Sequence, residues 1–254
     1  MKTKLLYILL MLFLSVQLMA QEGITTFGVQ FKPIVPLNYI DGGKQTKEQT
    51  NISYSIEPNF GYSFGMVVRK GITKNISIET GINYLRRNFS LTINDRDSAF
   101  ISESQFSMDT YEIPVSGLVY VQLGRETFMN VSGGLSFDIY PTPLFVNEYE
   151  VFANAVNRRS WVQVSLIANV GWEYRSRESG YFYVGFSFHR PFSPLMQSIV
   201  TYEAFNRNQE MRFDLSGNYL TLDLRYFFHE EKEKKTVKKD FRQPKPEHLK
   251  KKKQ

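Results

Sequence analysis

Hydrophobic and polar residues alternate with a period of two in many short segments of this 254-residue chain. One such segment is residues 219–228, YLTLDLRYFF, where Thr221, Asp223 and Arg225 share one face and leucine and aromatic residues share the other. A period of two indicates a β-strand. Ten residues suit a tilted membrane-spanning strand, which takes about 9–11. We therefore predict that this segment closes a transmembrane barrel, because a soluble sheet edge with this face would aggregate.

Other segments with the same alternation predict seven further strands. In residues 76–93 the apolar positions change phase, from Ile78 and Ile82 to Phe89 and Leu91, and we predict a β-bulge near residues 85–87 that produces this shift. The seven predicted strands are 25–32, 60–69, 76–93, 111–123, 127–139, 161–174 and 181–189.

The connections between these strands alternate in length. An even number of strands, with short turns at one end and long loops at the other, is typical of a bacterial outer-membrane barrel whose two termini are periplasmic. The predicted fold class is therefore all-β, an eight-stranded antiparallel up-and-down transmembrane β-barrel. A soluble sandwich or lipocalin-like barrel would instead point its apolar face inward. The predicted long loops are 33–59, 94–110, 140–160 and 190–218, and the short turns are 70–75, 124–126 and 175–180.

Composition agrees with a barrel that alternates polar and apolar residues. Aromatic residues make up 15% of the chain, and the mean hydropathy is −0.31. Beyond the N-terminus no apolar run approaches the roughly 18 residues of a spanning helix. Aromatic side chains such as Trp172, Tyr174 and Phe182 at one end of the strands, and Phe60 and Phe137 at the other, predict two interfacial girdles.

The two ends of the chain differ in character from the predicted barrel, residues 21–228. Residues 1–20 have a basic start and an apolar centre and predict a secretory signal peptide. Residues 229–254 hold eleven Lys/Arg against five Asp/Glu, an excess equal to the net charge of +6. The composition of this tail predicts a disordered, basic periplasmic extension. The chain has no cysteine, which excludes disulfides, thiol catalysis and a lipid-attached cysteine.

Residues 61–87, GYSFGMVVRKGITKNISIETGINYLRR, and 111–123, YEIPVSGLVYVQL, resemble the outer-membrane β-barrel domain that is common in Bacteroidota and is often called PorT-like. The resemblance covers about residues 24–228 and involves a glycine-spaced strand, a turn and a second strand. It implies an eight-stranded barrel. One member of this family is needed for type IX secretion, so the resemblance also implies an accessory role in secretion.

The faces opposite the apolar ones are expected to fill the barrel interior. An eight-stranded barrel is only wide enough for side chains to fill, and charges buried there must pair. We therefore expect a polar network with a structural role. Its charged members are Lys32, Arg69, Glu79, Glu112, Asp138, Glu173, His189, Asp223 and Arg225.

A small lipid-modifying enzyme is the alternative function. Lipid A deacylases of this size use a His-x-Ser pair with an acid, but here His189 is followed by Arg190 and Pro191, and Ser193 lies beyond the proline. With three histidines and no cysteine we expect neither a transition-metal site nor a cofactor. We predict that the protein is not an enzyme.

The favoured hypothesis is a structural or interaction component of the cell envelope, such as an accessory subunit of a secretion or uptake complex. Aromatic residues in the long loops are typical of a partner surface, and the basic tail suits an anionic lipid or an acidic partner. The expected partners are outer-membrane lipid and an envelope protein, and export excludes nucleic acid. The predicted contact residues are Phe145, Tyr149, Phe152, Phe192, Tyr202, Phe205, Lys250, Lys251, Lys252 and Lys253.

Overall fold

The structure is a computed structural model of the 254-residue chain. It describes residues 25–37, 42–73, 75–141, 144–148, 152–176, 179–204 and 208–228. The predicted signal segment and tail lie outside these ranges. No helix among the described residues is both long and apolar enough to cross a membrane. The described elements are β1 (Thr25–Pro36), β2 (Gln45–Gln49), β3 (Ile52–Gly71), β4 (Ile76–Asp95), β5 (Phe100–Gln122), β6 (Thr127–Ile139), β7 (Leu144–Glu148), β8 (Phe152–Arg158), β9 (Val162–Arg175), β10 (Tyr181–Pro191), β11 (Met196–Tyr202), β12 (Gln209–Leu215) and β13 (Tyr219–Phe227).

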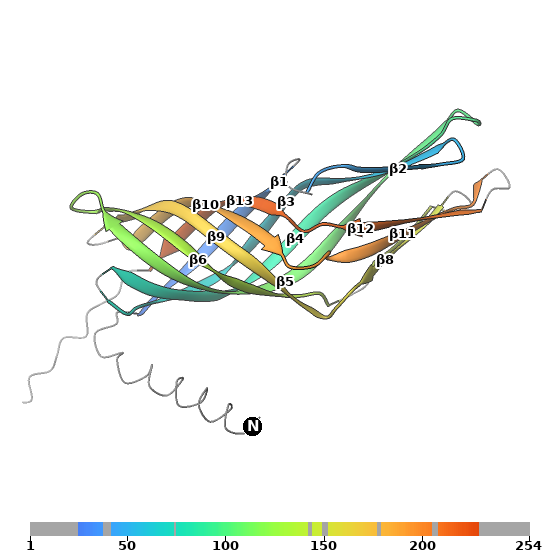
Figure 1. The fold of residues 1–254 in the computed structure, drawn as a ribbon. Coiled ribbons are helices and arrows are strands. Elements are labelled where there is room, and N and C mark those ends of the chain that lie inside the picture. The colour runs from blue at the N-terminus through green and yellow to red at the C-terminus, as the bar shows by residue number, and fades with distance from the viewer. Residues whose placement is uncertain are drawn as a thin grey trace, which may run out of the picture.

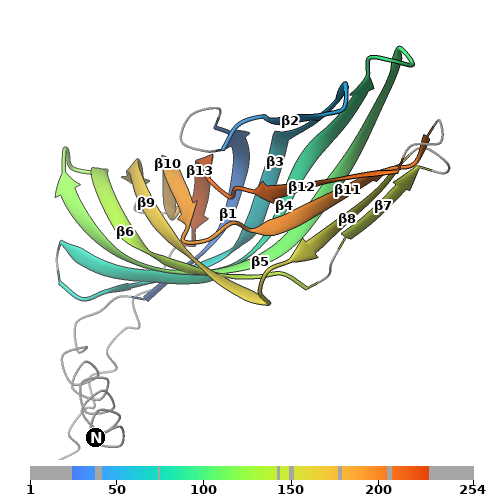
Figure 2. The ribbon, with the colours of Figure 1, turned by 45° about the vertical axis from the view of Figure 1, so that its right-hand side comes forward.

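Eight of these strands form a closed ring (Figures 1 and 2). Their order is β1-β13-β10-β9-β6-β5-β4-β3, and pairing of β1 with β3 closes it. Every neighbouring pair is antiparallel, which confirms the predicted eight-stranded barrel. Thr25 pairs with Lys70 and Tyr181 with Phe227, so β1 begins and β13 ends beside the short turns. We call this the short-turn end.

Side chains on the ring alternate between outside and inside, as the sequence pattern predicts. Phe27, Val131 and Phe186 project outward and are 59%, 52% and 51% exposed. Asn130 and Ser132, the sequence neighbours of Val131, are buried. Because the apolar faces point outward all round the ring, the wall is suited to hydrocarbon and the interior is polar.

The strands at the other end continue far beyond the length that a bilayer requires. β3 and β4 have 20 residues each and β5 has 23, whereas spanning takes about 9–11. At ~3.3 Å per residue, β5 is about 75 Å long. The prediction of long loops is therefore wrong. Residues 33–59 include β2, residues 94–110 belong largely to β4 and β5, and the last two predicted loops contain β7, β8, β11 and β12.

These added strands build a two-layered region, which we call the extension (Figure 2). It comprises residues 52–59 of β3, 88–95 of β4 and 100–110 of β5 with β2, facing a four-stranded sheet of order β12-β11-β8-β7. A dry core lies between the two layers. It includes Tyr54, Leu91, Met108, Val200 and Phe213, none of which is more than 1% exposed. The two layers are also joined at the β2–β12 seam, where Gln45 and Lys47 donate side-chain hydrogen bonds of 2.9 and 2.6 Å to backbone carbonyls of β12.

The predicted bulge near residues 85–87 is wrong in its place and in its reason. β4 keeps one phase throughout, and the register shift lies in its partner β3, between Asn59 and Tyr62. Phe89 and Leu91 point inward like Glu79, and they are apolar because they face the core of the extension. The extension is thus patterned like a soluble sheet, apolar inside and polar outside, whereas the barrel has the reverse pattern.

Candidate functional site: the charged interior of the barrel

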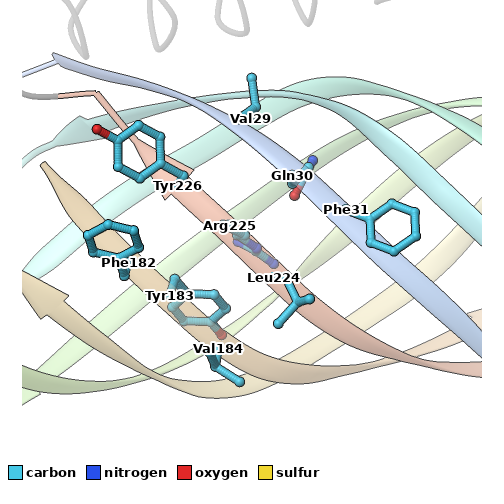
Figure 3. A pocket seen from close by; sticks show the side chains of 9 residues that line it. All are labelled: Val29, Gln30, Phe31, Phe182, Tyr183, Val184, Leu224, Arg225 and Tyr226. Atoms are coloured by element: carbon cyan, nitrogen blue, oxygen red, sulfur yellow. The ribbon is translucent and has the colours of Figure 1, made fainter.

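All nine charged residues predicted for the interior lie there, and each is at most 7% exposed. They come from all eight strands of the ring, because each is an inward position of its own strand. Figure 3 shows this alternation across β1, β13 and β10. Val29, Phe31, Leu224 and Tyr226 line a shallow outer groove of about 380 Å³.

The largest charged group lies toward the short-turn end. The Arg69 guanidinium is 3.0 Å from Glu79 and also pairs with Glu173. Arg225 pairs with the second oxygen of Glu79 and lies 2.5 Å from Asp223. Each of these carboxylates therefore has an arginine partner, and Glu79 has two. Pairing of this density is what makes burial of the charges tolerable.

Aromatic rings fill the space behind the arginines. The guanidinium carbon of Arg69 lies 3.9 Å from the centre of the Phe227 ring, and that of Arg225 lies 4.7 Å from the Tyr183 ring. The Tyr183 ring can lie along the inner wall over β9 and β10 because Gly171 and Gly185 have no side chain. A Cβ at either glycine would be 2.4 Å from the tyrosine hydroxyl oxygen. These residues leave little room for a water-filled path.

A second polar group lies farther toward the extension. His189 Nδ1 is 3.1 Å from Glu112 Oε1, and its ring stacks on Tyr219 with centroids 4.3 Å apart. Asn83 donates a hydrogen bond of 2.8 Å to Glu112. The Ser165 hydroxyl donates one of 2.5 Å to Asp138. The proton of this serine is therefore directed at Asp138 and not at His189, unlike the serine of a nucleophile–base pair.

Lys32 connects the two groups electrostatically, since its charge acts on Glu79, Glu112 and Asp223. Within the described ranges, no cluster of three or more His, Cys, Asp or Glu side chains is placed to hold a metal ion.

Sequence reasoning missed several interior residues, of which Arg87 is the most consequential. It is 5% exposed, stacks at 4.3 Å on Tyr219 and donates a 3.4 Å hydrogen bond to the Gly217 carbonyl. Its signal was its odd position on β4, which shares the inward face of Glu79. The erroneous bulge at residues 85–87 concealed it.

The extension core closes the barrel interior at the end opposite the short turns. Tyr140, which directly follows β6, is fully buried in that core. Burial raises the pKa of the Tyr140 phenol well above its usual range.

Two predicted partner-contact residues are corrected by the structure. Phe152 and Tyr202 are 2% and 0% exposed, because they pack in the extension core instead of standing on loop tips. Phe192 is 68% exposed. The side chains of the other predicted contacts lie outside those that the structure describes, namely Phe145, Tyr149, Phe205 and Lys250, Lys251, Lys252 and Lys253.

Comparison with solved structures finds a similar architecture in OprG. The chain is similar to the outer membrane protein OprG from Pseudomonas aeruginosa, with a TM-score of 0.52 at 8% sequence identity, covering 81% of this chain and 96% of that one. It is also similar to the outer membrane protease OmpT from Escherichia coli, with a TM-score of 0.40 at 10% identity and the same two coverages. At 8% identity the likeness to OprG shows the fold alone. No curated protein matches the chain.

The sequence itself matches a known family over residues 24–197, which is more than half of the chain. The match begins immediately before β1 and extends into β11, so it includes seven of the eight ring strands in full. The apolar outer wall, the closed ring and this match agree: the chain belongs to the outer membrane protein β-barrel domain family, and its place is the bacterial outer membrane.

Proposed function

We propose that this protein is a non-conducting, non-enzymatic anchor that holds the extension at the cell surface for an envelope partner. In outer-membrane barrels the short turns and the termini are periplasmic, and the longer connections are extracellular. The extension then projects outward from the cell, and both termini are periplasmic.

The observation that carries this proposal is the contrast between a filled interior and a large built extension. The arginine–carboxylate pairs and Tyr183 occupy the lumen, and the extension core caps it. Conduction or transport needs a path, whereas anchoring needs none. Several strands that run on as a two-layered sheet are more structure than a closed pore requires, and a stable surface supports recognition.

The finer assignment rests on the sequence resemblance. We place the chain with the PorT-like proteins of Bacteroidota, exported by a signal peptide at residues 1–20, and we assign it as an accessory subunit of a type IX-like secretion complex or of an uptake complex. The basic tail at residues 229–254 would then contact an anionic surface or an acidic partner in the periplasm, with outer-membrane lipid surrounding the barrel.

Two measurements test the proposal. The purified protein in planar lipid bilayers should show no conductance steps, and membranes of a deletion strain should have unchanged lipid A. A protein of the envelope should co-purify stoichiometrically after gentle detergent extraction. Its recovery should fall when the extension core is disrupted by Val200→Asp, with Ser90→Asp on the outer face as the matched control. Discrete conductance, altered lipid A, or equal recovery with both variants would contradict the proposed function.

A further inference from the structure

β5 has two neighbours in the barrel but one in the extension. Residues 100–110 of β5 pair with residues 85–95 of β4. Pairing with β6 begins below them, at Tyr111 and Ile139. The upper part of β5 is therefore the edge of its sheet in the part of the chain that the structure describes.

The backbone direction along this edge follows from the hydrogen bonds at the foot of β5. Tyr120 N–H donates to Asn75 O, on the β4 side, and Leu123 N–H donates to Thr127 O, on the β6 side. Backbone groups of successive strand residues point to opposite sides. The odd residues of β5 therefore direct their N–H and C=O groups away from β4. Above Tyr111 these include Glu103, Gln105, Ser107 and Asp109, which form no ladder with another described strand.

This edge lacks two features by which proteins often block an open strand. Residues 100–110, FISESQFSMDT, contain no proline and no lysine, and the register with β4 is continuous from Asn83 to Asp95. Such an edge is a template for another strand. It is also held firmly in place, because Phe106 and Met108 are anchored in the extension core. The β2–β12 seam, by contrast, is covered by the side chains of Gln45 and Lys47.

We propose that the upper edge of β5 binds an extended segment of a partner protein by β-strand addition. This inference rests on the proposed function and names the surface that performs it. Main-chain hydrogen bonds to the odd residues of β5 would supply the affinity, and alternate side chains the specificity.

The side chains beside the edge define the chemistry of the partner segment. Its inner face would lie next to Phe106 and Met108 and would continue the core, so it should be apolar. Its outer face would lie beside the exposed carboxylate of Glu103 and the half-buried carboxylate of Asp109, so it should carry lysine or arginine. The partner segment is therefore a strand that alternates apolar and basic residues.

A second copy of this chain fits the edge less well. Two copies in one membrane share their orientation, so a twofold axis along the membrane normal brings their β5 strands together in parallel. Parallel pairing is slightly less stable per residue than antiparallel pairing. A free segment is able to adopt the antiparallel direction.

The test uses the full-length protein in detergent and a fluorescent ten-residue peptide that alternates valine and lysine. Binding should be at least tenfold weaker for Gln105→Pro, which removes an N–H that points to the open edge and leaves the bond to β4 intact. Gln105→Ala, which keeps that N–H, should bind like the unmodified protein. Glu103→Pro is a second variant of the same kind. Heat-modifiable gel mobility selects the variants that retain the fold.

Two further peptides separate strand addition from adhesion of a basic peptide. A peptide N-methylated at alternate residues, and one with glutamate in place of lysine, should each bind at least tenfold more weakly. Equal binding by all three peptides, or by folded Gln105→Pro and Gln105→Ala, would overturn the inference. So would a disulfide-linked homodimer of Gln105→Cys as the main product in cells.

The same variants separate this inference from the proposed function. If the envelope partner is lost with Val200→Asp but kept with Gln105→Pro, strand addition at β5 is wrong and the anchor function stands. If the partner is kept with Val200→Asp, the anchor function is wrong as well.

Discussion

Replacing Arg69 with methionine tests most directly whether the barrel interior is a closed ionic network. Arg69 pairs with Glu79 and Glu173 and stacks on Phe227. In Arg69→Met, Glu79 keeps Arg225, but Glu173 keeps only its 2.6 Å pair with Arg175, whose side chain is 32% exposed. Removing one partner of a buried ion pair costs roughly 3–5 kcal/mol, because it leaves a charge uncompensated. We expect a loss of about that size, since methionine preserves much of the packing.

A second substitution should restore part of the lost stability. In the double variant Arg69→Met/Glu173→Gln the orphaned carboxylate is gone, and contacting residues couple by roughly 0.5–3 kcal/mol. Urea unfolding in lipid vesicles gives the free energies of unfolding. The signal is the fluorescence of the chain's two tryptophans, of which Trp172 is 49% exposed on the outer wall.

The matched control is Arg86→Met, which removes an arginine whose side chain is 41% exposed and lies 3.9 Å from Asp109. Its midpoint should stay close to that of the unmodified protein, because water solvates the charge left behind. If Arg69→Met and Arg86→Met shift the midpoint equally, the interior is as well hydrated as the surface. A hydrated lumen would refute both the closed network and the non-conducting anchor.

Three other substitutions probe the wall, the lumen and the extension. Val131→Arg, on the lipid face, should cost about 2–4 kcal/mol in vesicle unfolding, whereas Ser90→Arg on the extension should not; equal effects would contradict the assigned lipid face. Gly171→Ala forces a Cβ to within 2.4 Å of the Tyr183 hydroxyl oxygen and should cost about 1–3 kcal/mol by the same measurement, as overpacking does; an unchanged midpoint would show a roomier lumen. Phe213→Ala should remove about 3–5 kcal/mol from the extension, making it sensitive to protease on intact cells while heat-modifiable mobility persists; loss of that mobility would show that the barrel depends on the extension.

The barrel was predictable from sequence because lipid imposes a strict rule on it. Every spanning strand must be apolar outward, so a period of two reveals both the strand and its phase. Residues 127–139 were predicted with the observed bounds of β6. The charged interior followed from the same rule: Glu79 and Asp223 are inward because their neighbours are outward.

The extension was not predictable by that rule, because outside the membrane the pattern reverses. Phe89 and Leu91 are apolar and inward, and reading them as lipid-facing created a bulge that β4 does not have. Phe152 and Tyr202, which looked like exposed loop aromatics, are core residues for the same reason. Pairing of β8 with β11 joins segments about 40 residues apart, and no local pattern specifies it.

The unbroken course of β4 and β5 from the short-turn end to the tip also has a mechanical consequence (Figure 1). A hinge needs a few residues that absorb large changes in backbone angle, and the continuous ladder between these two strands offers none above Asn83. A force on the far end of the extension is therefore transmitted through the sheet without bending it. The barrel itself must then tilt in the bilayer. An anchor of this kind would report load at the cell surface as a change of angle in the membrane.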